Sequence, residues 1–109
     1  MSEEIIASDN NFDEILKSNS DKLVVVDFYA DWCMPCRMLA PILDKAAKKK
    51  GENVVIVKLN VDINPQKSRE YKISGIPAVK LFKKSKIIDE FVGFKDQKEI
   101  ELIIERNLK

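Results

Sequence analysis

The pattern of hydrophobic positions along the chain alternates between continuous apolar runs and runs with helical spacing. Residues 23–30 and 54–59 are continuous apolar runs rich in β-branched side chains, which is typical of strands covered on both faces of a sheet. Residues 78–82 and 87–92 form two further apolar segments around a lysine-rich tip. They predict a hairpin, although the tip lacks the glycine common in such turns.

Four other segments predict helices. Ser8 or Asp9 can cap the first, which carries Phe12, Ile15 and Leu16 on one face. The second begins at Cys33 and ends near Gly51. Residues 64–71 give a weaker helical pattern. Apolar side chains recur at helical spacing in the second segment: Met38, Leu39, Ile42, Leu43, Ala46 and Ala47.

A proline and a possible capping box refine the helix predictions. Pro41 lies inside the second helix, and we expect it to kink that helix. Asp96 and Glu99 have the spacing of a capping box, which predicts the start of a last helix. Its inward face would be Ile100, Ile103, Ile104 and Leu108. Strands alternating with helices predict an α/β protein, and 109 residues suffice for one domain over residues 1–109.

Composition and charge exclude several classes of partner. The chain has 19 Lys plus Arg against 18 Asp plus Glu, a net charge of +1, which offers no field for nucleic acid or an anionic membrane. The basic clusters at 48–50 and 83–86 are interpreted as solvated positions at a helix end and a hairpin tip. No apolar segment is long enough to span a bilayer and no export signal is visible. We therefore expect no nucleic-acid or membrane partner.

The candidate chemistry is carried by Cys33 and Cys36, which lie three positions apart where an apolar run meets a helix. On a helix this spacing puts Cβ atoms about 5 to 6 Å apart, whereas a disulfide needs about 3.5 to 4.5 Å. A small adjustment therefore opens or closes the bond. A loop so short removes little entropy from the unfolded chain, so stabilisation is a poor reason for the bridge.

Metal binding and a purely structural disulfide are the alternatives for this spacing. A zinc or iron–sulfur site needs about four ligands, and the chain has 2 Cys and 0 His. Secreted disulfide scaffolds carry several pairs and an export signal, and neither is present. We expect a redox-active pair, with no metal and no cofactor.

The position of each cysteine predicts its role. Cys33 lies at the helix start, where free backbone N–H groups and the helix dipole favour the thiolate that attacks a disulfide. Cys36 lies one turn further in and is placed to resolve the mixed disulfide. Pro35 suits the first helical turn, and Trp32 is expected on the surface beside the thiols.

Asp27 and Lys58 each interrupt an apolar run. A carboxyl group buried there is expected to have a raised pKa and a mobile proton. The alternative is a structural carboxylate paired with Lys58 from the neighbouring strand.

Residues 26–37, VDFYADWCMPCR, resemble the active-site segment of thioredoxins. Residues 38–43, 58–62, 75–77 and 92–93 also fall where that family has its markers, so the resemblance covers nearly the whole chain. It implies a central mixed sheet of five strands flanked by four helices and a cis peptide bond before Pro77. It also implies protein-disulfide reductase activity, with thioredoxin reductase as electron donor.

The resemblance further implies roles for single residues. Asp27 would take the proton from Cys36 as that thiol attacks, with Lys58 tuning Asp27. The backbone of Ile76 would pair with an extended substrate segment. The residues expected to contact substrate proteins are Trp32, Met34, Pro35, Val61, Ile76, Pro77, Val92 and Gly93.

Four residues depart from the common thioredoxin pattern. Met34 replaces Gly between the cysteines, where residues tune the redox potential, and adds flexible apolar surface. Arg37 replaces Lys, Tyr29 replaces Trp, and Ala78 replaces Thr, and we expect these to be minor. The resemblance favours a cytoplasmic, monomeric disulfide reductase. A disulfide isomerase or oxidase and a non-catalytic binding module remain as alternatives.

Overall fold

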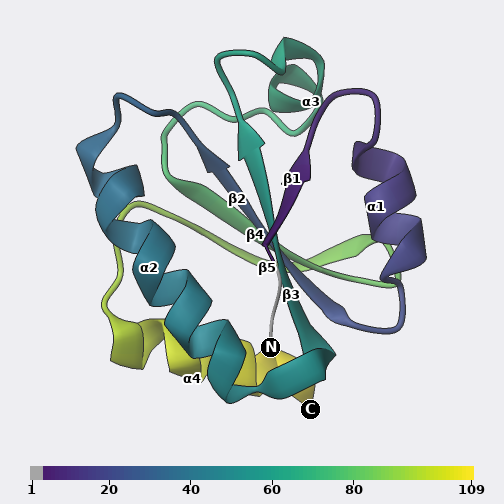
Figure 1. Cartoon of the computed structure of the whole chain (residues 1–109), viewed down its shortest axis with the longest axis vertical. Helices are drawn as coiled ribbons and strands as arrows, with labels where there is room; N and C mark the ends of the chain where they lie inside the picture. The colour runs from purple at the N-terminus through teal and green to yellow at the C-terminus, as the bar shows by residue number, and fades with distance from the viewer. Residues whose placement is uncertain (1–3) are drawn as a thin grey trace.

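The computed structural model describes residues 4–109. Five strands form one mixed sheet in the order β1-β3-β2-β4-β5, with parallel pairing of β3 to β1 and β2 and antiparallel pairing of β4 to β2 and β5. The strands are β1 (Glu4–Ala7), β2 (Leu23–Tyr29), β3 (Val54–Asn60), β4 (Ala78–Lys83) and β5 (Lys86–Val92). The helices are α1 (Phe12–Ser18), α2 (Met34–Lys49), α3 (Pro65–Glu70) and α4 (Gln97–Leu108), with a short 3-10 turn at Gly51–Asn53. This is the predicted α/β fold with five strands and four helices (Figure 1).

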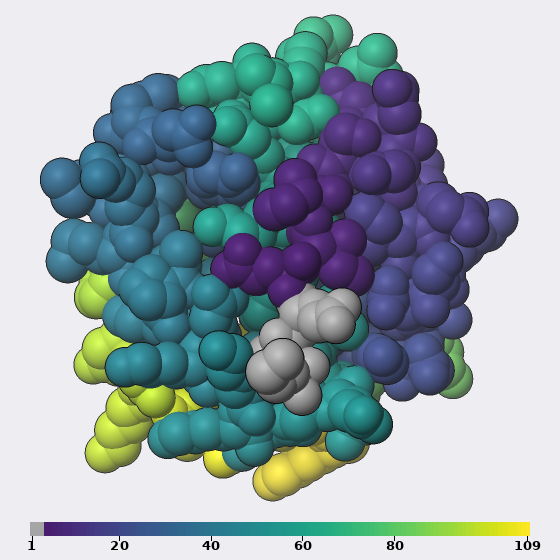
Figure 2. Space-filling model, viewed as in Figure 1, coloured from purple at the N-terminus to yellow at the C-terminus, as the bar shows by residue number. Residues whose placement is uncertain are grey.

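Each face of the sheet carries its own hydrophobic core. One core joins Val25 and Ile56 of the central strands to α2 and α4. The other packs α1 against the opposite face and contains the aromatic group Phe12, Phe28 and Phe82. Because β2 and β3 are covered on both sides, their sequences read as continuous apolar runs, as predicted. β1 forms one edge of the sheet, and its surface lies between α1 and α2 in Figure 2.

Two expectations for helices are wrong in detail. α1 begins at Phe12 after Asn11, and the Asp9 side chain caps a different helix, α3, by accepting hydrogen bonds from the backbone N–H groups of Gln66 (3.2 Å) and Lys67 (2.8 Å). Met38 was expected on the inner face of α2, but it is 53% exposed. Both errors arise because neighbouring elements, which the local pattern does not reveal, decide which groups are covered.

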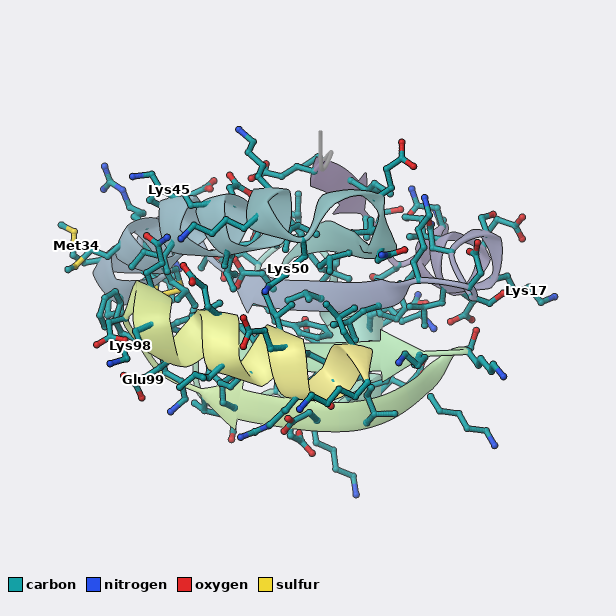
Figure 3. The ribbon with its side chains drawn as sticks, turned by 90° about the horizontal axis from the view of Figure 1, so that it is seen from below. Lys17, Met34, Lys45, Lys50, Lys98 and Glu99 are labelled. Atoms are coloured by element: carbon teal, nitrogen blue, oxygen red, sulfur yellow. A yellow bond between two sulfur atoms is a disulfide. The ribbon has the colours of Figure 1, made fainter. Side chains whose placement is uncertain are left out.

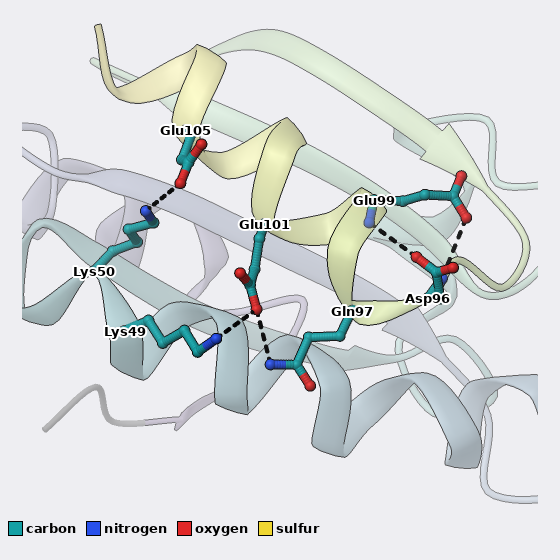
Figure 4. A network of polar contacts seen from close by, with 7 residues as sticks. All are labelled: Lys49, Lys50, Asp96, Gln97, Glu99, Glu101 and Glu105. Carbon is teal, nitrogen blue, oxygen red and sulfur yellow. Dashed lines mark hydrogen bonds and ion pairs between the residues drawn. The ribbon is translucent and has the colours of Figure 1, made fainter.

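The lysine clusters are mostly exposed, as expected: Lys48, Lys49, Lys84 and Lys86 are exposed, and Lys50 and Lys83 are half-buried. Lys49 and Lys50 at the end of α2 form ion pairs with Glu101 (3.0 Å) and Glu105 (2.7 Å) of α4 (Figure 4). Lys83 donates to the carbonyl oxygen of Asn107 at 2.9 Å. The two ion pairs join the C-terminal end of α2 to α4, and the Lys83 contact joins β4 to the end of α4.

The predicted capping box at the start of α4 is confirmed. The backbone N–H of Glu99 donates to the Asp96 carboxylate at 2.9 Å, and the Glu99 side chain accepts from the Asp96 N–H at 3.5 Å (Figure 4). Ile100, Ile103 and Ile104 face the core as expected, and Leu108 packs against its margin. Within residues 4–109, no helix combines the length and apolar character needed to cross a bilayer.

The hairpin tip between β4 and β5 generates the first prediction. Lys84 and Ser85 have φ of 52° and 65°, the left-handed conformation that strains a residue with a Cβ atom. Ser85→Gly is therefore expected to raise the free energy of unfolding by about 0.5 to 1 kcal/mol, measured by denaturant titration. Ser20→Gly, at a turn position without positive φ, is the control and should not stabilise. A loss of stability in Ser85→Gly would show that the turn is not strained.

Candidate active site

The end of β2 positions both cysteines. The strand ends at Tyr29, and the backbone N–H of Cys33 then donates to the carbonyl oxygen of Ala30 at 3.2 Å, which turns the chain into α2. Cys33 is the N-cap of that helix, and its sulfur accepts from the N–H of Cys36 at 3.3 Å. Pro35 lies in the first turn, where its missing N–H leaves no bond unmade.

Cys33 and Cys36 form a disulfide, with their Cα atoms 5.2 Å apart. Both residues are buried, so their burial differs little. Their difference lies in the helix field: the Cys33 sulfur lies at the first N–H groups of α2, whereas Cys36 is already inside the helix. When the pair is reduced, this field favours the thiolate of Cys33.

A second loop backs the disulfide. The Ile76–Pro77 peptide bond is cis, as expected, and the carbonyl oxygen of Ile76 lies 3.9 Å from the Cys33 sulfur. The carbonyl oxygen of Pro77 accepts from the N–H of Gly93 at 2.8 Å. Val61, which follows β3, also packs against the cysteines, so the loops after β3, before β4 and after β5 meet there.

The surface around the cysteines is apolar and exposed. Trp32 is 71% and Met34 is 59% exposed, and Val92 is also exposed, whereas Val61 and Ile76 are half-buried against the disulfide. Figure 3 shows Met34 projecting outward from the end of the molecule that also carries Lys98 and Glu99 of α4, opposite Lys17.

The expected substrate-contact residues gather at this end of the sheet, though not all are exposed. Pro35 and Met34 lie on the first turn of α2, and Gly93 follows β5. Pro77 is buried beneath the surface, where it supports Ile76. The structure therefore brings the candidate residues together around one disulfide, while Pro77 lies in a supporting position.

Asp27 is a carboxyl group buried in the sheet. It is 1% exposed, and neither oxygen has a hydrogen-bond partner among the residues that the structure describes. Burial raises the pKa of Asp27 from its usual 3.8 to about 7, more than the positive charge of Lys58 lowers it. The proton of Asp27 is therefore exchangeable near neutral pH.

Lys58 does not form the ion pair that was the alternative interpretation of Asp27. The two residues are direct neighbours in the β2–β3 register, but the Lys58 ammonium lies over the ring of Tyr29, 4.5 Å from its centroid. Both Lys58 and Cys36 line a hollow of about 460 Å³, together with Tyr29, Ala30, Asp31, Arg37 and Ala40. Lys58 thus affects Asp27 through its charge alone.

Sequence reasoning missed two residues of the site. The Trp32 indole N–H donates to the Asp62 carboxylate at 2.8 Å, which orients an otherwise exposed ring. Asp62 belongs to a segment that resembles a thioredoxin marker, which was the available signal. Tyr29 was treated as a minor replacement, but its ring holds Lys58. Its role depends on the register of β2 and β3, which the sequence does not display.

No group of three or more His, Cys, Asp or Glu side chains within residues 4–109 could hold a metal ion. The chemistry available is exchange at the disulfide. A CxxC pair capping a helix, backed by a cis-proline loop and a buried carboxyl group, defines a thiol–disulfide oxidoreductase.

Comparison with known proteins supports this class. The thioredoxin family model matches residues 3–106. The thioredoxin of Alicyclobacillus acidocaldarius subsp. acidocaldarius is 38% identical over 94 residues, which are 86% of this chain and 88% of that protein. The thioredoxin of Buchnera aphidicola subsp. Baizongia pistaciae is 47% identical over 74 residues, 68% of each chain. The mitochondrial thioredoxin of Bos taurus is 39% identical over 88 residues, 81% of this chain and 53% of that protein.

The chain therefore belongs to the thioredoxin family. Its activity is thiol–disulfide reduction, with Cys33 and Cys36 as the redox-active pair. Disulfide-containing proteins are the substrates of this family, and a reductase restores the dithiol.

The raised pKa of Asp27 makes stability depend on pH. Because the pKa is about 7 in the fold and 3.8 as its usual value, the neutral form stabilises the fold fully below about pH 4. As pH rises from about 4 to 7, the unfolded chain loses this proton before the fold does, so the contribution of Asp27 to the free energy of unfolding is lost. Between pH 5 and pH 8 it should fall by about 2 to 3 kcal/mol.

Replacing Asp27 with Asn, which is neutral at every pH, should remove this dependence. Denaturant unfolding of the oxidised protein at pH 5 and pH 8 measures the fall in the free energy of unfolding, in the parent and in Asp27→Asn. Glu14→Gln, at an exposed position of α1, is the control for the loss of one carboxylate. An equal fall in the parent and Asp27→Asn would mean that Asp27 is already ionised in the fold at pH 5.

Proposed function

We propose that the protein reduces disulfides of other proteins by a two-step exchange in which Cys33 attacks and Cys36 resolves. This proposal rests mainly on one observation: Cys33 is the N-cap of α2, and its sulfur accepts a hydrogen bond from the N–H of Cys36. The Cys33 thiolate attacks one substrate sulfur and releases the other as a thiolate. Cys36 then attacks the Cys33 sulfur, which releases the second substrate thiolate and leaves the oxidised pair.

Asp27 accepts the proton of Cys36 during the second step, and Lys58 tunes it. The raised pKa of Asp27, about 7, supports a group that can both take and return a proton at neutral pH. Cys36 and Lys58 line the same hollow, and Lys58 neighbours Asp27 in the register of the sheet. These positions put the thiol and the carboxyl group on the side of the sheet that α2 covers.

The substrate segment lies in extended form against Ile76. The carbonyl oxygen of Ile76, close to the Cys33 sulfur, is available to pair with a backbone N–H of the substrate as an added strand. The exposed side chains of Trp32, Met34 and Val92 surround that position. A shallow apolar surface of this kind suits proteins of varied sequence better than one small molecule. Pro35, Val61, Pro77 and Gly93 complete or support the contact surface.

We base the proposed location, oligomeric state and electron donor of the protein on its family. We place the protein in the cytoplasm as a monomer and electron donor, re-reduced by thioredoxin reductase. An isomerase or oxidase would use the same cysteines, and a binding module would need only the apolar surface. The buried carboxyl group favours the reductase over the binding module, because a protein that only binds has no use for it.

Single serine variants test the assigned roles. Cys36→Ser should form a stable mixed disulfide with a protein substrate through Cys33, because no thiol remains to resolve it. Cys33→Ser should form none, and both variants should lose turnover. Trapping is read by non-reducing electrophoresis and mass spectrometry of the linked peptide.

The outcome that contradicts the assignment is trapping through Cys36 in Cys33→Ser with none in Cys36→Ser. The double variant Cys33→Ser/Cys36→Ser separates the reductase from the binding module. If the double variant retains the cellular function of the protein, the exchange reaction is not its role.

A further inference from the structure

A second group of ionisable side chains lies on the same face of the sheet as Asp27. In the registers of β1, β3 and β2, Glu4 neighbours Ile56 and Ile56 neighbours Val25, while Lys58 neighbours Asp27. Alternate residues of a strand share a face. Glu4, Lys58 and Asp27 therefore all face α2, and Glu4 lies at the exposed edge of that face.

Helix α2 brings a carboxyl group to the same place. Cys36, Ala40 and Asp44 are four positions apart, so they lie along one side of the helix. The first two line the hollow that also contains Lys58, and Asp44 lies one turn beyond it. This side of α2 therefore carries Cys36 at one end and the half-buried carboxyl group of Asp44 at the other.

Glu4 and Asp44 are the two carboxyl groups that β1 and α2 bring to this side of the sheet. Glu4 stands on β1 at the edge of the face that α2 covers, and Asp44 stands on the side of α2 that carries Cys36 and Ala40. Burial first, and then the Glu4 carboxyl group, raise the pKa of Asp44 to about 6, while Lys58 and Lys48 lower it. The charges of Lys58 on β3 and Lys48 on α2 act on Asp44, and Asp27 on β2 lies on the same face of the sheet.

The pair acts against Lys58 in its effect on Asp27. The charge of Lys58 lowers the pKa of Asp27, and the charges of Glu4 and Asp44 raise it. The Lys58 ammonium is held over the Tyr29 ring instead of bonding to Asp27. Its influence is therefore long-range and can be offset by carboxylates that do not touch Asp27.

We propose that Glu4 and Asp44 are positioning residues for the proton of Asp27: their two carboxyl groups offset the charge of Lys58, so that Asp27 holds an exchangeable proton at neutral pH. This inference deepens the proposed function, because it gives Asp27 the proton-carrying role assigned above. The pair lies between the buried carboxyl group and the edge of the sheet, and it acts through charge. Removing either carboxylate should therefore change the titration of Asp27 while the fold stays the same.

The test follows the Asp27 carboxyl carbon by NMR in protein labelled with carbon-13 at the aspartate carboxyl groups. The oxidised form is used because its cysteines do not titrate. The variants are Glu4→Gln, Asp44→Asn and the double variant, with Glu14→Gln on the opposite face as the matched control. Asp27→Asn assigns the signal, and Lys58→Gln calibrates the direction.

The titration midpoint of Asp27 should move to lower pH in Glu4→Gln and Asp44→Asn, and further in the double variant. It should move to higher pH in Lys58→Gln and remain at the parent value in Glu14→Gln. Midpoints in Glu4→Gln and Asp44→Asn that match Glu14→Gln, or that rise, would overturn the inference. A shift of equal size in Glu14→Gln would overturn it too, because the effect would then be one of net charge.

Failure of the proposed role of Asp27 is visible separately. The rate of substrate-disulfide reduction at pH 7 in Asp27→Asn tests that role, and we expect a loss of at least about tenfold. An unchanged rate would remove Asp27 from the reaction. The carbon-13 midpoints would then still decide whether Glu4 and Asp44 set the proton affinity of Asp27.

Discussion

The hydrogen bonding of β2 to β3 on one side and β4 on the other holds every part of the site in place. β2 is the middle strand of the sheet, buried on both faces, and its last residue lies directly before the turn into Cys33. Its parallel register with β3 sets Asp27 beside Lys58. Its antiparallel register with β4 brings the start of β4, and with it the cis Ile76–Pro77 peptide, to the same end. A slip of one residue in either register would turn Asp27 to the other face and separate these groups.

The buried carboxyl group of Asp27 lowers the stability of the fold at its position on β2. An apolar residue at position 27 would continue the core formed by Val25 and its neighbours, whereas the carboxyl group there has no hydrogen-bond partner among residues 4–109. An unpartnered buried acid weakens the fold once it is ionised. In the proposed mechanism this cost accompanies the role of Asp27 in holding a proton for the resolving thiol.

The charged groups around Asp27 act on its proton in opposite directions. Lys58 lies near enough to favour the carboxylate, but the Tyr29 ring holds its ammonium, and the carboxyl groups of Glu4 and Asp44 oppose it. Burial raises the pKa of Asp27 most, and together with these charges it leaves a carboxyl group that titrates near neutral pH instead of one fixed in an ion pair. The proposed mechanism uses such a balance, because in it Asp27 takes the proton of Cys36 and later returns it.

Local features of the sequence predicted most of the fold. The continuous apolar runs gave β2 and β3, and the Asp96–Glu99 capping box marked the start of α4, because each signal is contained within a few neighbouring residues. The errors concern contacts between distant segments. Asp9 caps α3 instead of α1, and the ion pair of the exposed Lys49 with Glu101 of α4 was not predicted.

In the candidate site, too, local features were predicted from the sequence and contacts between distant segments were not. The CxxC spacing and the buried carboxyl group were visible in the sequence. The Tyr29–Lys58 contact and the Glu4–Asp44 pair depend on strand register and on the rotation of α2, which local patterns do not specify.

The equilibrium reduction potential of the Cys33–Cys36 pair tests the central claim most directly. The protein is titrated against a thiol buffer, and the redox state is followed by the fluorescence of Trp32, the one tryptophan of the chain. A reversible two-electron transition at or below about −220 mV, the potential of a reducing glutathione pool, is what a disulfide reductase requires. A value near about −120 mV, typical of a strong oxidant, or the lack of a reversible transition would contradict the assignment.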